Sequence, residues 1–269
     1  MQEMSVFWLR AAAVLYSLGL LHAILTILRR EERFFGPAFT AFLMGATVHG
    51  VSIVERWVHK GRFPVDNFFE SIGLCAFLLA TSFLFLNWKY EFRSLGVFLF
   101  PLVFFMAMLG GMESPVGAWP STSVRGAVLL AHVSLVMLGY AALLVTALAS
   151  VFYLIEERRL KQKLASKLFR RLPPLSTLDV IITRAMGAGF TLITVATILG
   201  ISWAQREGQA DWIMQPRIMI SLATWALCLL MVFLRTSVGW RGRKAAVMAL
   251  MILGCSALTW AAKVFLKPS

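Results

Sequence analysis

Eight long apolar runs divide this sequence and leave few ways for it to fold. Each run has about the 20 apolar residues that an α-helix needs to cross the hydrocarbon core of a bilayer. Since hydrocarbon offers no water, every backbone polar group there must be paired within its own segment, which favours helices. The runs cover approximately 6–28, 36–54, 68–87, 94–112, 127–155, 180–204, 218–235 and 245–266.

The composition agrees with a membrane protein. Of the 269 residues, 59% are hydrophobic and only 14% are charged, whereas about a quarter of a typical soluble domain is charged. This fraction of charged residues is too low to cover a surface that faces water. We therefore predict an all-α, polytopic transmembrane helix bundle of about eight spans, with 1–269 as a single transmembrane domain.

The basic residues indicate an orientation in the membrane. The net charge is +13, and the Lys and Arg residues are concentrated between the apolar runs. One alternate set of loops holds twice as many of them as the other, and the positive-inside rule assigns that set to the cytoplasm. Both termini then face outward, and the basic excess serves topology and anionic lipid headgroups rather than nucleic acid.

Two histidines at membrane depth are candidate ligands. His49 lies in the outer part of the second run, and His132 lies near the outer start of the fifth. A planar ligand between these antiparallel helices could accept an axial nitrogen from each, and imidazole suits haem iron. One interpretation of this pair is therefore noncovalent haem b, with His49 and His132 as metal ligands. The alternative is that each histidine only hydrogen-bonds a neighbouring helix.

Several other polar side chains each have two interpretations. Arg184, near the inner end of the sixth run, could reach the headgroups or bind an anion such as a haem propionate. Glu70 is either a buried carboxylate or a helix cap. Trp212 is either an interfacial anchor or part of a platform for a large flat ligand. His22, near the inner end of the first run, is typical of a satisfied interfacial histidine.

The sequence has no motif that predicts a catalytic residue. It lacks a nucleophile–base pair, a Gly-rich phosphate loop and an HExxH pattern. The paired broken helices that are typical of many transporters are also missing. A small-solute transporter is therefore the third of the functions that we consider.

Several segments occur in a characteristic order from about residue 40 to the C-terminus. They are Pro64–Ser71 (PVDNFFES), His132 followed by Tyr153-Leu154, Leu178-Asp179 with Arg184, Gly189-Phe190, Gly200–Ala204 (GISWA), and Thr224-Trp225 with Gly239–Arg243 (GWRGR). Together they resemble the cytochrome c assembly protein family, whose members handle haem in the membrane.

The resemblance implies roles for particular residues. His132 matches an outward-facing haem-ligand histidine of the family, and His49 matches a membrane-embedded histidine of an early span. Gly208–Arg217 falls where the family has a tryptophan-rich haem-binding loop, of which only Trp212 and Pro216 remain here. The chain is therefore more similar to the HemX-type branch, which has the same core and a degenerate loop, than to a complete haem lyase.

These observations predict a haem-binding protein of the bacterial inner membrane that acts in cytochrome c biogenesis or haem handling. It would serve as a carrier, accessory or sensor rather than an enzyme, with other cytochrome c assembly proteins as possible partners. The alternative is a membrane regulator of haem biosynthesis. Such a regulator would dock a soluble partner, for instance a haem-biosynthesis enzyme, through its basic cytoplasmic segment Arg158–Arg171.

Overall fold

The structure is a computed structural model that describes residues 2–29, 32–60, 64, 68–112, 123–162, 173–206, 214 and 216–265. Within these ranges the chain is all-α, as predicted. The helices are α1 (Gln2–Arg29), α2 (Phe35–Lys60), α3 (Phe68–Tyr90), α4 (Gly96–Gly110), α5 (Ser123–Gln162), α6 (Leu175–Arg206), α7 (Pro216–Ser237) and α8 (Arg243–Phe265), with short 3₁₀ turns at Glu32–Phe34 and Arg93–Leu95.

Among the described helices, six are long and apolar enough to cross a membrane, namely α1, α2, α3, α5, α6 and α7. The α4 helix is apolar throughout but has only 15 residues, which is about 22 Å of helix against a hydrocarbon core of about 30 Å. The chain is thus a multi-pass membrane protein. The helices follow the predicted order, and the outward placement of both termini stays a prediction.

The second helix is longer than predicted. The second apolar run was expected to end near residue 54, but α2 continues to Lys60. Within the added turns Glu55 and His59, four residues apart, face each other at 3.8 Å between carboxylate and imidazole. Arg56 is consequently a helical residue and not part of a loop.

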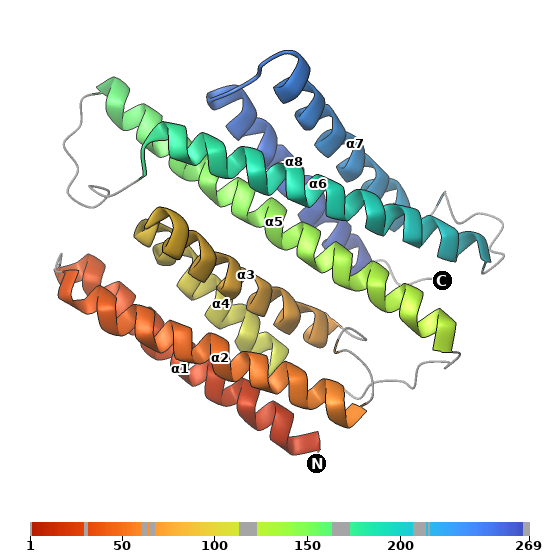
Figure 1. The fold of residues 1–269 in the computed structure, drawn as a ribbon, viewed down its shortest axis with the longest axis horizontal. Coiled ribbons are helices and arrows are strands. Elements are labelled where there is room, and N and C mark those ends of the chain that lie inside the picture. The colour runs from red at the N-terminus through yellow and green to blue at the C-terminus, as the bar shows by residue number, and fades with distance from the viewer. Residues whose placement is uncertain are drawn as a thin grey trace. The chain divides into compact units, whose positions relative to one another are not determined.

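Helices α1 to α4 form one compact unit, which we call the first unit. Each helix packs against the next along the chain, and α1 also packs against α4 (Figure 1). Aromatic rings fill the centre: Phe42 stacks on Phe100 with ring centroids 4.2 Å apart, and Phe83 meets both edge-on. All three rings are fully buried.

Helices α5 to α8 form the second unit, with the same order of neighbours: α5 on α6, α6 on α7, α7 on α8 and α8 on α5. The α5 and α6 helices approach closely at Gly139, where an added Cβ would lie 2.6 Å from Cγ1 of Ile193. This contact fixes how α5 and α6 face each other. The description of the whole chain as a single domain stays a prediction.

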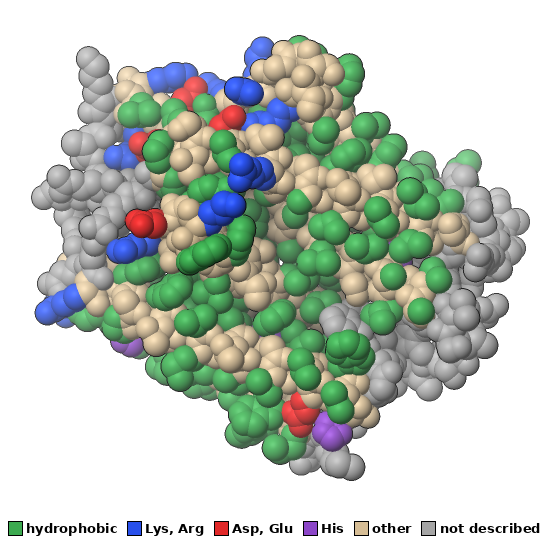
Figure 2. Space-filling model, in the orientation of Figure 1, with side chains coloured by type: hydrophobic (Ala, Val, Ile, Leu, Met, Phe, Trp, Pro, Cys, Tyr) green, Lys and Arg blue, Asp and Glu red, His purple; other side chains and the backbone are tan. Residues whose placement is uncertain are grey.

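Hydrophobic side chains cover much of the visible surface, and Lys and Arg side chains gather near helix ends (Figure 2). In the second unit the last turns of α5 and α7 carry Arg159, Lys161 and Arg235, and α8 begins at Arg243. Since consecutive helices in this unit run in opposite directions, these residues belong to one end of it. We call it the basic end.

Candidate functional site

The imidazole of His132 is held by the neighbouring helix in the second unit. Its Nδ1 lies 2.7 Å from the backbone carbonyl oxygen of Ala196 on α6. A carbonyl oxygen can only accept, so Nδ1 donates its hydrogen and Nε2 of the neutral ring carries the lone pair. The ring also packs on Gly200, where an added Cβ would lie 2.7 Å from Cε1 of His132. Helix α6 therefore sets both the tautomer and the position of the ring.

The sequence left two alternatives for His132, ligation of haem iron and a hydrogen bond to a neighbouring helix, and this arrangement is compatible with both. His132 does hydrogen-bond a neighbouring helix, and the same bond is the one that usually orients a metal-binding histidine through its second nitrogen. Imidazole nitrogen suits iron. The donor chemistry at His132 therefore fits the axial ligation of haem.

His49 has a different environment in the first unit. Its side chain is buried in α2, with Nδ1 3.4 Å from the hydroxyl oxygen of Tyr16 on α1. The Tyr16 ring occupies a notch at Gly45, one turn before His49, where an added Cβ would lie 2.8 Å from the ring. Phe77 on α3 contacts the imidazole edge-on at 5.6 Å between centroids. Three helices thus enclose this ring.

A small cavity adjoins His49. Its volume is about 20 Å³, and its polar lining comes from His49, Ser52, Arg56 and Glu70. A single water molecule needs roughly 10–15 Å³ by the same kind of measure. The cavity therefore suits a water-sized polar group, and a porphyrin ring does not fit inside it.

Glu70 is a buried carboxylate in the first turn of α3. Nη1 of Arg56 lies 3.4 Å from its Oε1, and only 2% of the glutamate side chain is exposed. Of the two alternatives for Glu70, the structure supports the buried carboxylate. The Arg56–Glu70 ion pair was missed in the sequence because Arg56 was expected in a loop.

Three further residues were singled out in the sequence. Arg184 is exposed on α6, as expected for a side chain that reaches the headgroups, and its role toward a propionate stays a prediction. Nδ1 of His22 donates to the carbonyl oxygen of Leu18 in its own helix at 2.9 Å. Trp212 lies outside the described residues.

His49 belongs to the first unit and His132 to the second, so joint ligation of one iron stays a prediction. Over the described part of the chain, no three His, Cys, Asp or Glu side chains gather into a metal site. Haem iron is commonly held by single histidines, so its ligation does not require such a cluster.

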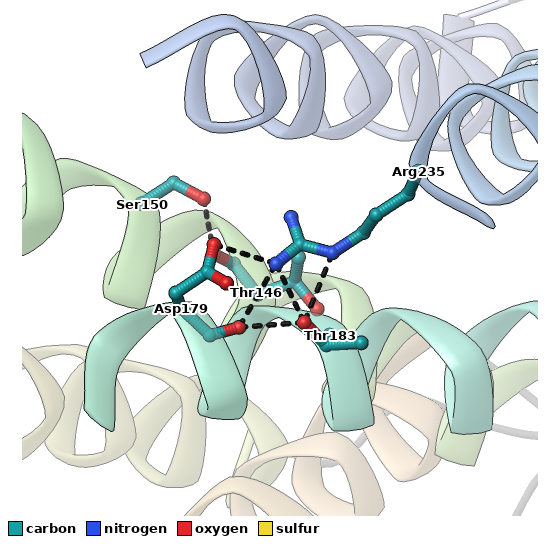
Figure 3. Close-up of polar contacts among 5 residues, drawn as sticks. All are labelled: Thr146, Ser150, Asp179, Thr183 and Arg235. Carbon is teal, nitrogen blue, oxygen red and sulfur yellow. Dashed lines mark hydrogen bonds and ion pairs between the residues drawn. The ribbon is translucent and has the colours of Figure 1, made fainter. Parts of the chain in front are cut away.

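A second ion pair, between a buried arginine and a partly buried aspartate, was also missed in the sequence. Arg235 was counted among the cytoplasmic loop cations, but it lies in the last turn of α7 and is buried. Its Nη2 donates to Oδ1 of Asp179 at 2.6 Å and to the backbone oxygen of that residue at 3.0 Å. Its Nε donates to the hydroxyl of Thr183 at 2.9 Å (Figure 3). The sequence did offer one indication of this site: Asp179 and Thr183 are four residues apart and therefore lie on the same face of a helix.

The fold and these sites define a polytopic helical membrane protein in which single histidines are positioned by neighbouring helices. The chain belongs to the cytochrome c assembly protein family, because the family model described as "Cytochrome C assembly protein" matches residues 38–261. This confirms the family that the sequence segments resembled.

Curated relatives agree with this assignment. The cytochrome c biogenesis protein CcsA of Guillardia theta is 24% identical over 242 residues, covering 83% of this chain and 80% of that protein. The protein of the same name from Microcystis aeruginosa is 27% identical over 242 residues, covering 72% of this chain and 74% of its own. The similarity therefore extends over most of both proteins.

Proposed function

We propose that this chain is a haem-binding membrane protein of cytochrome c biogenesis that carries, senses or helps to deliver haem b. The observation that carries the proposal is the hydrogen bond from His132 to Ala196, which leaves the lone pair of the ring on Nε2. Bound haem would supply an iron that accepts this nitrogen. His49 is the second ligand in the proposal; because its ring is buried and the adjoining cavity of about 20 Å³ holds no porphyrin, haem binding there requires the enclosing helices to move apart.

We assign the chain to the HemX-type branch and to the bacterial inner membrane. Support for the branch comes from the loop Gly208–Arg217, which keeps only Trp212 and Pro216 of the family's tryptophan-rich motif. Support for a membrane location comes from the six described helices that are long and apolar enough to span a bilayer. In this proposal the chain works beside other cytochrome c assembly proteins and does not form the covalent haem bond itself.

The length of α5 favours a second candidate function, a regulator that docks a soluble partner. Its 40 residues make about 60 Å of helix, roughly twice the thickness of the hydrocarbon core. Ion pairs at 2.6 Å (Glu156–Arg159) and 2.7 Å (Glu157–Lys161) stabilise its last turns. A partner that co-purifies equally well after deletion of 158–171 would dismiss this docking role.

Absorption spectroscopy of the purified full chain tests the main proposal. We expect a Soret band after addition of haemin in detergent, with a low-spin spectrum if two imidazoles bind the iron. The His132→Ala variant should lose most of the band, and the His49→Ala variant should change its spin state or intensity. The matched controls are His22→Ala and His59→Ala, which remove an imidazole from outside both sites.

The controls should retain the wild-type spectrum. A protein that takes up no added haemin contradicts haem binding altogether. A Soret band that survives unchanged in the double variant His49→Ala/His132→Ala contradicts the ligand assignment.

A further inference from the structure

Three of the sequence segments that the proposed haem site does not use meet at the basic end of the second unit. Tyr153 comes from α5, Asp179 from α6 and Gly242 from the turn before α8. An added Cβ at Gly242 would lie 2.9 Å from the hydroxyl oxygen of Tyr153. At the end of α7, Nη2 of Arg235 lies 2.6 Å from Oδ1 of Asp179. Residues far apart in the sequence therefore form one polar cluster at the basic end.

Arg235 has unused hydrogen-bonding capacity in this cluster. Its side chain is 6% exposed, and its Nε and Nη2 donate to Thr183 and Asp179 on α6. Its Nη1 is buried and has no hydrogen-bond acceptor among the residues that the structure describes. Figure 3 shows this nitrogen pointing away from Asp179 and Thr183. Because a buried N–H group without an acceptor destabilises a protein, native structures seldom leave one unsatisfied.

We propose that Nη1 of Arg235 binds a phosphate group at the basic end of the second unit, as presented by the headgroup of an anionic phospholipid. A guanidinium group matches phosphate oxygens in both charge and geometry. The Asp179 carboxylate occupies the opposite side of this guanidinium, so it neutralises the charge without filling the Nη1 position.

The surroundings of Arg235 fit an anionic ligand. Arg241, Arg243 and Lys244 follow closely in the chain and are exposed. The positive-inside rule assigns this end to the cytoplasmic leaflet, where basic sites between helices bind anionic headgroups. The turn between α7 and α8 contains two glycines with positive φ, Gly239 at 71° and Gly242 at 68°. A Cβ added at Gly239 would meet nothing within 4 Å, so the space beside this turn is open at Gly239.

A purely structural role for Arg235, as a clamp between α6 and α7, makes a different prediction. A clamp stabilises the unit but has no preference among lipids. The two roles can therefore be separated by measuring selective lipid binding together with stability. Neither role depends on haem, so the test is independent of the proposed function.

The experiment uses the full chain purified in detergent. Native mass spectrometry counts retained phosphatidylglycerol, and thermal unfolding is followed with added phosphatidylglycerol, phosphatidylcholine or inorganic phosphate. The variants are Arg235→Gln and the double variant Asp179→Asn/Arg235→Gln, which removes both charges and leaves no unpaired buried carboxylate. Arg158→Gln is the matched control, because it removes an exposed arginine from the C-terminal part of α5, at the same end of the same unit.

We expect phosphatidylglycerol, but not phosphatidylcholine, to stabilise the wild type and Arg158→Gln. Its apparent affinity should fall about tenfold or more in both Arg235 variants, as expected for the loss of a charged hydrogen bond. Inorganic phosphate that reproduces the Arg235-dependent effect would support the site and identify the free anion as its ligand. Equal phosphatidylglycerol binding by the wild type and the double variant would overturn the proposal, as would equal binding of the two lipids. If Arg235→Gln does not fold, phosphatidylglycerol binding by the double variant alone tests the proposal.

Discussion

The substitution Gly200→Ala tests whether α6 positions the imidazole of His132. The added methyl group would lie 2.7 Å from Cε1 and 3.0 Å from Nδ1 of that ring, well inside van der Waals contact. Either the ring turns away, or α5 and α6 separate. In both cases the 2.7 Å hydrogen bond from Nδ1 to the Ala196 carbonyl is broken or strained.

The expected loss of stability follows from these contacts. Overpacking of this kind destabilises a protein by about 1–3 kcal/mol, and a lost hydrogen bond contributes about 0.5–1.5 kcal/mol. The better helix propensity of alanine offsets about 1 kcal/mol. We therefore expect a net destabilisation of about 1–3 kcal/mol, together with weaker haemin binding, because the ring no longer presents Nε2 in its native position.

Reversible unfolding in mixed micelles measures the loss of stability, and haemin titration at the Soret band measures the loss of haemin affinity. Gly187→Ala is the matched control, since it makes the same change in the same helix with nothing within 4 Å of the new Cβ. It should be neutral or stabilising by up to about 1 kcal/mol.

A double-mutant cycle locates the effect at the ring itself. With His132→Ala in the background, the clash partner is absent, so Gly200→Ala should become much less destabilising. If Gly200→Ala behaves like Gly187→Ala, or if its effect is unchanged without the imidazole, then α6 does not position His132 in the way argued above.

Two further predictions concern packing and charge. Asp179→Asn should destabilise the protein by about 3–5 kcal/mol, because it leaves the buried Arg235 charge uncompensated. The control Glu157→Gln, which loses a pair with an exposed lysine, should change stability by less than about 1 kcal/mol. Equal effects of the two substitutions in unfolding experiments would contradict the role of burial. Gly110→Ala should destabilise the first unit by about 1–3 kcal/mol, since its Cβ would lie 2.8 Å from the Cα of Gly73. In the control Gly36→Ala the new Cβ meets nothing within 4 Å, so this substitution should be neutral. Similar unfolding midpoints for the two variants would show that α3 and α4 are not in backbone contact.

Much of the fold could be predicted from the sequence. Apolar runs of about 20 residues with few charges form helices in a membrane, because no other local structure pairs the backbone there. This reasoning found all the described helices in order. It misplaced the end of α2, because the charged residues Glu55 to Lys60 read as a loop although their spacing supports further helical turns.

The candidate site was only partly predictable. His49 and His132 could be chosen because ionisable groups at membrane depth are rare and tend to be functional. Their different environments could not be foreseen: a carbonyl on α6 binds one ring, and a tyrosine on α1 binds the other. The partners come from other helices, at separations of 64 and 33 residues along the chain.

The sequence by itself determined that this protein is a helical membrane protein of the cytochrome c assembly family, since hydropathy and ordered motifs are properties of the chain alone. Tertiary structure decided which charged residues are buried. Arg56 and Arg235 look like ordinary flanking cations until helix packing sets them against Glu70 and Asp179. Burial of a charge depends on what the neighbouring helices place around it, and that information is not local in the sequence.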